Sequence, residues 1–340
     1  MTAPVRINLA LQGGGAHGAF TWGACDRLLR EPGVEIAAIS GTSAGAMNGA
    51  AIKAGLSRGS RELARENLEW LWRQVSRIGD LRLTTWMQPF APGAGAVAAA
   101  LESSPAWAAW DAATRAVSPY AYGPLYRNPL EGIAERFHYD AVCAADGPAF
   151  HVSATNVRTG KVRVFGTREI TAQVLLASAC LPTLFRAVEI DGEAYWDGGY
   201  TGNPALFPLF DPALPDDIVI VNVNPFVRTD IPTTAREIQN RINEISFNTS
   251  LLRELRAIEF VQRLIAEGRI AEGTMKDVKV HMIRDDALMA RLNVATKTVP
   301  TRLVIDPLRA AGEVAAQAFI ERHLDDLGRR GTVDLRAMFG

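Results

Sequence analysis

This chain contains few cysteines and no long run of residues of like charge. The 340 residues include three cysteines, Cys25, Cys143 and Cys180, and no C-x-x-C pair. This spacing argues against a disulfide framework and favours reduced thiols in a cytoplasmic protein. Lys and Arg (36) nearly balance Asp and Glu (37), which gives a formal net charge of −1. Because no long basic block is present, we do not expect a nucleic-acid partner.

The sequence also lacks a recognisable secretory leader and a convincing membrane span. The apolar stretch Ile7–Leu11 is too short for the core of a signal peptide. The uncharged run Ile36–Ile52 approaches the length of a span but is rich in Gly, Ser and Ala. We interpret it as a buried strand, turn and helix. The expectation is a soluble, cytoplasmic protein, with peripheral membrane contact left open.

Strand and helix patterns alternate through the first part of the chain. Strands are predicted at Arg6–Gln12 and Val34–Ser40, and helices follow at Ala19–Arg30 and Ser43–Ala54. With 48% hydrophobic residues, the chain can bury a sizeable core. Alternation of this kind favours a parallel sheet that is covered by helices on both faces.

The character of the sequence changes in its last third. Thr234–Glu267 predicts a long amphipathic helix with apolar residues on more than one face, which indicates burial or a homo-oligomer. A strand is predicted at Val278–Ile283 and a closing helix at Leu308–Leu327. We therefore divide the chain into a first domain, residues 5–225, and a mainly helical extension, residues 226–340. The extension packs on the core or continues it.

Aromatic residues gather in residues 81–126 without a regular period. They are Trp86, Phe90, Trp107, Trp110, Tyr120, Tyr122 and Tyr126. One interpretation is a set of core-packing connections. The other is a cover over an apolar site, since aromatic rings with polar tips suit the boundary between water and an apolar surface.

One serine stands between two glycines where a predicted strand meets a predicted helix. Gly41-Thr42-Ser43-Ala44-Gly45 reads G-x-S-x-G. Gly41 permits a sharp turn, Gly45 permits a close approach of the helix, and the helix N-terminus favours negative charge near the serine. The pattern predicts a nucleophile on a strand-to-helix turn, with an N-capping serine as the alternative.

The same pattern occurs a second time, around Ser57. Gly55-Leu56-Ser57-Arg58-Gly59 also reads G-x-S-x-G. No strand is predicted before it, so we interpret this copy as a loop.

A run of glycines follows the first predicted strand. Gly13-Gly14-Gly15 offers backbone N–H groups to a developing oxyanion. The run also satisfies the dinucleotide fingerprint G-x-G-x-x-G through Gly13, Gly15 and Gly18. That fingerprint needs an acidic residue at the end of the second strand, whereas Glu35 lies at its start. Acyl transfer is therefore favoured over dinucleotide binding.

A serine nucleophile needs a general base. His281 or His323 would complete a Ser-His-Asp triad, but neither lies in a loop flanked by glycines. Asp197 follows a predicted strand and precedes Gly198 and Gly199, so its carboxylate can lie close to another backbone loop. Taken alone, this sequence also fits an ordinary Asp-Gly turn.

Four motifs in this order resemble the patatin-like phospholipases. They are Gly13-Gly14-Gly15-x-x-Gly18, Gly41-x-Ser43-x-Gly45, Ala177-Ser178-x-x-x-Pro182-x-x-Phe185 and Asp197-Gly198-Gly199. The resemblance covers about residues 5–225. It implies a three-layer α/β/α fold with a mainly parallel sheet.

The resemblance also implies a serine acyl hydrolase that uses a Ser–Asp dyad. Ser43 would attack the carbonyl of a lipid or fatty-acyl ester, and Asp197 would accept the hydroxyl proton. Water would then release the acid from an acyl-enzyme. No metal or organic cofactor is implied. The remaining implied residues are the oxyanion-hole residues Gly13, Gly14, Gly15 and Ala16, the turn glycines Gly41 and Gly45, and the supporting residues His17, Gly198 and Gly199.

His17 departs from the family pattern, because many members carry Arg or Lys at this position. We interpret His17 as a hydrogen-bond donor behind the loop or as a structural residue. Alternative activities are a short-chain esterase, a thioesterase or a storage-polyester hydrolase. Alternatives of other classes are a dinucleotide-binding oxidoreductase and a non-catalytic scaffold that binds lipid.

Overall fold

The computed structural model describes residues 3–79, 117–271 and 273–339, together with positions 100, 104, 105 and 109. Four of the clustered aromatic residues, Trp86, Phe90, Trp107 and Trp110, lie outside the described residues. The prediction that the segment 81–126 covers a site therefore stays a prediction.

Eight strands in the described part of the chain form one mixed sheet. They are β1 (Val5–Leu11), β2 (Val34–Gly41), β3 (Ala149–Asn156), β4 (Val162–Phe165), β5 (Val188–Ile190), β6 (Glu193–Asp197), β7 (Asp217–Val221) and β8 (Lys279–Ile283). Their order is β5-β6-β3-β2-β1-β7-β8, and β4 pairs with β3. β3, β2, β1, β7 and β8 lie side by side in this order and run parallel. β4 and β6 pair antiparallel with β3, and β5 pairs antiparallel with β6. The expected mainly parallel sheet is confirmed.

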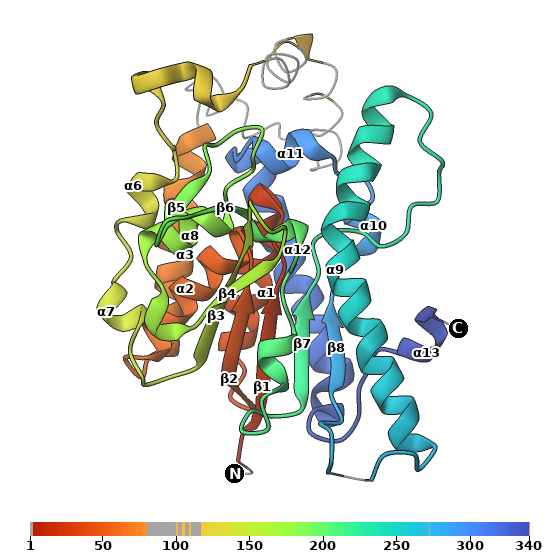
Figure 1. Cartoon of the computed structure of the whole chain (residues 1–340). Coiled ribbons are helices and arrows are strands. Elements are labelled where there is room, and N and C mark those ends of the chain that lie inside the picture. The colour runs from red at the N-terminus through yellow and green to blue at the C-terminus, as the bar shows by residue number, and fades with distance from the viewer. Residues whose placement is uncertain are drawn as a thin grey trace.

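Helices lie on both sides of this sheet (Figure 1). The α-helices are α1 (Gly18–Leu29), α2 (Ala44–Leu56), α3 (Arg61–Gly79), α6 (Glu131–Ala134), α7 (Tyr139–Val142), α8 (Ala172–Ser178), α9 (Ala235–Ala266), α10 (Asp286–Met289), α11 (Val294–Thr298), α12 (Arg302–His323) and α13 (Leu335–Phe339). Short 3₁₀ helices are η1 (Gly15–His17), η3 (Pro119–Leu125), η4 (Thr167–Glu169), η5 (Gly198–Tyr200), η6 (Phe207–Phe210) and η7 (Leu324–Asp326).

Alternate residues of the central strands belong to two separate hydrophobic cores. In β7, Val219 and Val221 pack into the core that includes α1, α2 and α12. Ile218 and Ile220 pack into the opposite core, with Leu251 and other residues of α9. Successive side chains of a strand point to opposite faces, so this distribution defines three layers. The predicted α/β/α fold is confirmed.

The last third of the chain contributes to all three layers. β8 pairs with β7, α12 packs against α1, and α9 covers the other face. The long helix predicted over residues 234–267 is α9. No helix of the described residues is long and apolar enough to cross a membrane. The division of the chain at residue 225 remains a prediction.

The predicted start of the closing helix was wrong. The expectation was Leu308–Leu327, whereas α12 begins at Arg302 and contains Pro307. A proline inside a helix removes one hydrogen bond and crowds the preceding turn. Here burial of Val304 and Ile305 in the first turns stabilises the helix in spite of that cost.

Candidate active site

Ser43 sits on a strained turn between β2 and α2. Its backbone has φ 55° and ψ −122°, a conformation that costs about 1–3 kcal/mol for a residue with a side chain. A Cβ on Gly45 would lie 2.1 Å from the Leu11 carbonyl oxygen, and one on Gly41 would lie 2.6 Å from the Gly45 carbonyl oxygen. The Ser43 side chain makes no capping hydrogen bond. The alternative of an N-capping serine is therefore not supported.

Asp197 reaches the same place because β3 changes its pairing partner along one edge. β2 pairs with β3 up to Val152, and β6 pairs with β3 from Ala154 onward. β4 pairs with Val152, which also pairs with β2, and with Ala154 and Thr155, which also pair with β6, so β2 and β6 both lie on the edge of β3 opposite β4. The C-terminal end of β6, at Asp197, therefore follows the C-terminal end of β2, at Gly41, along this edge of β3. A Cβ on Gly198 would lie 3.0 Å from the Thr42 methyl carbon, which shows how close the two loops come.

The Asp197 carboxylate is buried and is held by its neighbours. Its side chain accepts a hydrogen bond from the Gly199 N–H at 2.7 Å, and it lines the same cavity as Ser43. Only 1% of Asp197 and 7% of Ser43 are exposed. Burial raises the pKa of Asp197 to about 7, although the Gly199 N–H and the nearby Ser43 side chain lower it. The carboxyl group thus titrates near neutral pH while it lies near the serine.

The glycine loop after β1 lies beside Ser43. A Cβ on Gly13 would lie 2.8 Å from the Ser43 Cβ. Gly14, Gly15 and Ala16 line the same cavity as Ser43 and Asp197. They start the 3₁₀ helix η1, and the first N–H groups of a helix have no partner within it.

Gly13 differs from the other residues that the sequence predicts for an oxyanion hole. Its N–H donates to Asn203 Oδ1 at 2.7 Å. An N–H that is already paired in this way is not available to an oxyanion. Gly14, Gly15 and Ala16 stay the predicted donors, and Gly13 does not.

A network of buried amides, which sequence reasoning missed, holds the glycine loop. Gln12 Oε1 accepts from the N–H groups of Val223 and Asn224 at 2.9 and 3.1 Å. The Asn224 side chain donates to the Gly13 carbonyl at 2.9 Å. The signal that could have found it is the run Val221-Asn222-Val223-Asn224, where polar side chains follow directly on a buried strand.

Ser178 contacts the nucleophile turn directly. Its Oγ accepts a hydrogen bond from the Ser43 N–H at 2.8 Å, and the side chain is fully buried at the end of α8. The sequence marked Ser178 only as part of a motif. The structure gives it a function, because it satisfies a buried N–H of the strained turn.

None of the histidines lines this cavity, although all five lie within the described residues. His281 contacts Asp217 at 3.0 Å through Nε2 and Thr332 at 3.1 Å through Nδ1. His323 contacts Asp326 at 2.9 Å. The alternative of a Ser-His-Asp triad is therefore not supported, because no histidine lines the cavity of Ser43.

His17 lies behind the glycine loop rather than in the cavity. Its Nε2 lies 2.8 Å from Thr296 Oγ1 in α11. Burial moves the pKa of His17 well below its usual range, and the charges of Lys297 and Arg228 lower it further. The imidazole is consequently neutral and joins the loop to α11.

The dinucleotide alternative and the second serine motif are not supported by the geometry. Glu35 lies at the start of β2, at the opposite end of the strand from Ser43, and pairs with Arg6 at 3.3 Å. Ser57 follows α2, and its hydroxyl donates to the Ala54 carbonyl at 3.2 Å. Neither Glu35 nor Ser57 lines the cavity of Ser43.

The cavity above Ser43 and Asp197 has a volume of about 490 Å³. Most of its wall is apolar and comes from α2, α3, α9 and α11, from the residues just before α6, and from the segments after α8 and α11. The apolar lining residues are Met47, Leu71, Trp72, Val75, Ile78, Leu130, Leu181, Leu184, Phe185, Phe247, Val294 and Pro300. Polar groups in the wall include Gln239, Asn243 and Lys297.

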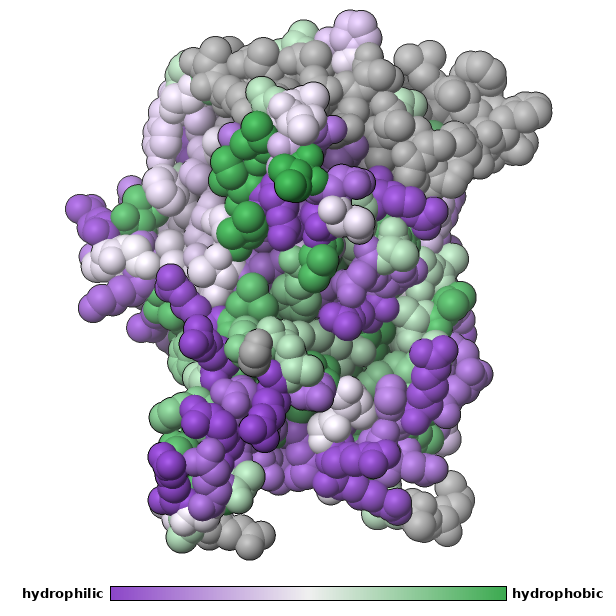
Figure 2. Space-filling view, turned by 90° about the vertical axis from the view of Figure 1, so that its right-hand side faces the viewer, coloured by the Kyte–Doolittle hydropathy of each residue, from purple (hydrophilic) through white to green (hydrophobic). Residues whose placement is uncertain are grey.

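Exposed apolar side chains lie on the same helix as part of this wall. Ile238, Ile242 and Ile245 of α9 are 42%, 52% and 52% exposed. Figure 2, which views the side of the molecule that carries α9, shows apolar side chains gathered in the upper part of this face. Asn243 and Phe247, which line the cavity, belong to the same turns of α9.

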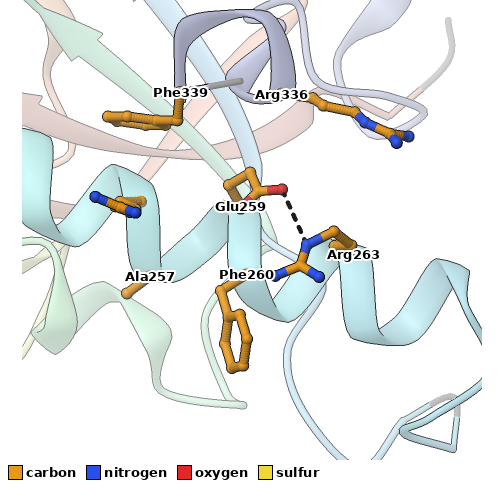
Figure 3. A pocket seen from close by; sticks show the side chains of 7 residues that line it. Ala257, Glu259, Phe260, Arg263, Arg336 and Phe339 are labelled. Atoms are coloured by element: carbon orange, nitrogen blue, oxygen red, sulfur yellow. Dashed lines mark ion pairs between the residues drawn. The ribbon is translucent and has the colours of Figure 1, made fainter.

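A second cavity, of about 530 Å³, lies between α9 and α13 (Figure 3). Its walls carry Arg256, Phe260, Arg263, Arg336 and Phe339, and Glu259 pairs with Arg263 at 3.4 Å. None of the described residues that line it is a serine, threonine or cysteine. Among the described residues, no group of His, Cys, Asp and Glu side chains is arranged to hold a metal ion.

These features agree with the comparison with protein families. Residues 9–210 match the patatin-like phospholipase family. The chain belongs to this family, and membership implies the general activity of a lipid acyl hydrolase. No curated protein matches the chain.

The chain is also similar to solved structures. VipD from Legionella pneumophila is 13% identical with a TM-score of 0.40, over 94% of this chain and 67% of that one. The type III effector ExoU is 14% identical with a TM-score of 0.36, over 95% of this chain and 54% of that one. In the ExoU–SpcU complex from Pseudomonas aeruginosa, the match is 17% identical with a TM-score of 0.31, over 99% and 75%. The family assignment rests on the family match.

Proposed function

We propose that this protein is a serine acyl hydrolase that cleaves fatty-acyl esters of lipids through a Ser43–Asp197 dyad. The observation that carries the proposal is that Ser43, on its strained turn, lines one cavity with the buried carboxyl group of Asp197, whose pKa burial raises to about 7. A base with such a pKa accepts a proton efficiently near neutral pH.

The proposed reaction begins when Ser43 Oγ attacks the ester carbonyl carbon. Asp197 takes the hydroxyl proton, and the carbonyl oxygen becomes an oxyanion. In this proposal the N–H groups of Gly14, Gly15 and Ala16, residues that line the same cavity, donate to this oxygen, and the positive end of α2 adds a favourable potential. Collapse of the intermediate leaves an acyl-Ser43 and releases the alcohol with the proton from Asp197.

The second half of the reaction uses water as the nucleophile. Asp197, ionised again, accepts a proton from water as the oxygen attacks the acyl carbon. The Ser43 oxygen leaves and recovers its proton from Asp197, and the fatty acid is released. The same carboxyl group thus acts as base and then as acid in both halves.

An acyl chain is the substrate part that suits the walls of the cavity. Leu71, Val75 and Leu184 are among the side chains that surround the space above Ser43. Burial of apolar surface contributes about 0.8 kcal/mol for each methylene group. We therefore expect kcat/KM to rise with acyl length until the cavity of about 490 Å³ is filled.

The test compares matched serine variants. A fluorophosphonate probe and acyl esters of increasing chain length are applied to the wild type, Ser43→Ala and Ser57→Ala. We expect labelling and turnover to be lost in Ser43→Ala and kept in Ser57→Ala. Labelling that survives in Ser43→Ala would contradict the assignment of the nucleophile.

The same experiment separates the alternative activities. Highest turnover with acetyl or butyryl esters would favour a short-chain esterase, and highest turnover with thioesters would favour a thioesterase. An Asp197→Asn variant with full activity would contradict the dyad.

A further inference from the structure

The peptide group between Gly13 and Gly14 carries one of the predicted oxyanion donors. Gly14 lines the cavity of Ser43, and its N–H donates to none of the described residues. Among those residues, the single cis peptide bond is Asn203-Pro204, so the Gly13–Gly14 peptide is trans. In a trans peptide the N–H points opposite to the C=O. The contacts of the Gly13 carbonyl therefore also set the direction of the Gly14 N–H.

The Gly13 carbonyl faces the side-chain amide of Asn224, which is fully buried. Asn224 Nδ2 donates to this carbonyl at 2.9 Å and also to Gln12 Oε1 at 3.2 Å. Asn203 Nδ2 lies farther from the same carbonyl, at 3.5 Å. Asn224 is therefore the main donor to the Gly13 carbonyl.

Lys297 fixes the orientation of the Asn224 amide. Its Nζ donates to Asn224 Oδ1 at 2.7 Å. An ammonium group only donates hydrogen bonds and a backbone carbonyl only accepts them. The Asn224 oxygen must therefore face Lys297, and its amide hydrogens must face Gly13. An Asn224 amide turned the other way would bring two oxygens together at the Gly13 carbonyl and lose that hydrogen bond.

Lys297 also brings a positive charge to one end of this chain of hydrogen bonds. Burial lowers its pKa to about 8, so the ammonium form predominates at about pH 7. Glu244 raises that pKa, and Arg228 lowers it further. Glu244 is itself paired with Arg228 at 3.1 Å and with Arg241 at 3.2 Å. One carboxylate thus faces three cations, so the charge of Lys297 is not cancelled by its surroundings.

The helix that carries Lys297, α11, is itself attached to the glycine loop. A Cβ on Gly15 would lie 2.3 Å from the Lys297 carbonyl oxygen. His17 Nε2 lies 2.8 Å from Thr296 Oγ1. These two contacts fix α11 against the loop, so the Lys297 side chain reaches Asn224 from a fixed base.

We propose that Lys297 is a positioning residue of the oxyanion hole, which acts through Asn224 on the Gly13–Gly14 peptide and does not itself contact the substrate. This inference rests on the proposed function and names the residue that supports its oxyanion donor. The Asn224 amide and the peptide group align head to tail between the ammonium and the Gly14 N–H. Hydrogen bonds joined in such a chain polarise one another. The chain thus orients the Gly14 N–H and strengthens it as a donor.

The kinetic test follows hydrolysis of an uncharged acyl ester at about pH 7 by the wild type and Lys297→Met. We expect kcat to fall about tenfold and KM to stay within about twofold, because the oxyanion forms only during the reaction. The loss is smaller than the roughly 10²–10³-fold that follows removal of a donor, since the Gly14 N–H remains. An unchanged kcat, with or without a higher KM, overturns the inference.

A second variant interrupts the chain of hydrogen bonds in its middle. In Asn224→Ala, Lys297 has lost its acceptor and the Gly13 carbonyl has lost its main donor. Lys297→Met should therefore cause no further loss of kcat when it is added to Asn224→Ala. Additive losses overturn the inference, because Lys297 would then act without Asn224.

A different buried lysine serves as the matched control. Lys53 lies in the last turn of α2, at the opposite end of that helix from Ser43, and is fully buried. Its Nζ donates to the Ala144 carbonyl at 2.8 Å. Lys53→Met should reduce stability in urea unfolding but leave kcat unchanged. An equal loss of kcat in Lys53→Met and Lys297→Met overturns the inference, because the effect would then be one of general stability.

An NMR measurement needs no substrate and therefore tests the inference independently of the proposed function. The chain contains three Gly-Gly peptides, which are Gly13-Gly14, Gly14-Gly15 and Gly198-Gly199. Glycine labelled with ¹³C at its carbonyl and with ¹⁵N gives one signal for each of them in a spectrum that links an amide N–H to the preceding carbonyl. In Lys297→Met we expect the Gly13 carbonyl signal to move upfield, because its hydrogen bond weakens. The Gly198 signal should stay in place.

The two kinds of failure are then distinguishable. An upfield Gly13 signal in Lys297→Met supports the inference even if the wild type hydrolyses no ester, a result that would contradict the proposed function alone. A Gly13 signal that does not move overturns the inference even if Ser43 proves to be the nucleophile.

Discussion

Asp197 offers a sharp test, because a general base works only when it is ionised. Burial raises the pKa of this carboxyl group to about 7. At about pH 5 only about one molecule in a hundred then holds an ionised Asp197, and at about pH 8 most do. We therefore expect kcat/KM for an uncharged ester to fall about tenfold for each pH unit below 7 and to level off above 8.

The perturbation is Asp197→Asn, which keeps an oxygen to accept the Gly199 N–H but removes the titrating group. Loss of a general base typically costs about 10²–10⁴-fold in rate, so the variant should lose that much at about pH 8. The residual kcat/KM of this variant should also stop falling at acidic pH, because no group in the dyad titrates.

The same pKa has a consequence for folding stability, with a defined sign. The folded pKa lies above the unfolded value of about 3.9, so folded Asp197 holds its proton more tightly between these pH values. The wild type is therefore destabilised as pH rises through this range, by about 4 kcal/mol in total. Asp197→Asn has no such ionisation, so its unfolding free energy relative to the wild type should increase by about 2–3 kcal/mol from about pH 5 to about pH 8.

Two assays measure these expectations. One is the pH dependence of kcat/KM with an uncharged ester, and the other is urea unfolding of both proteins at about pH 5 and about pH 8. A wild-type rate that does not change over this range, together with a constant stability difference, would refute the argument. Asp197 would then be ionised throughout, and burial would not control its titration.

Three further perturbations test the packing around the site. Gly45→Ala should lower the free energy of unfolding in urea by about 1–3 kcal/mol or more, because the added Cβ would meet the Leu11 carbonyl oxygen. Gly132→Ala should cause no comparable loss, because open space surrounds Gly132. Ser178→Ala leaves the Ser43 N–H without its acceptor, so we expect a loss of about 1–3 kcal/mol and slower fluorophosphonate labelling. Burial raises the pKa of Cys180 to about 12, so this thiol should react with a disulfide reagent only after unfolding.

The parts of the fold that local sequence determines were predictable. β2, the turn at Ser43 and α2 follow one another, and each has its own signal: an apolar run, two glycines and a helix of mostly small, apolar residues. Asp197 was predictable as a candidate because glycines follow a strand at that point. Its approach to Ser43 was not, because it depends on β3 pairing with β2 and then with β6 along one edge.

The residues that sequence reasoning missed act across long distances in the chain. Lys297 reaches Asn224, which in turn reaches Gly13. No periodicity links these positions, since Asn224 and Lys297 are ordinary polar residues, one after a strand and one in a short helix. The start of α12 was missed for a related reason, because burial against other elements outweighs the local effect of Pro307.

The contribution of the last third of the chain to every layer has a consequence for synthesis. In a growing chain, Ser43 and then Asp197 emerge from the ribosome well before β8, α11 and α12 have been synthesised. Until then, the edge of β7 lacks its parallel neighbour and the face of α1 lacks its covering helix. The wall that carries Lys297 is also missing at that stage. The proposed lipid-cleaving activity therefore arises at a late point of translation, and a nascent chain that stalls midway carries the nucleophile without a finished cavity.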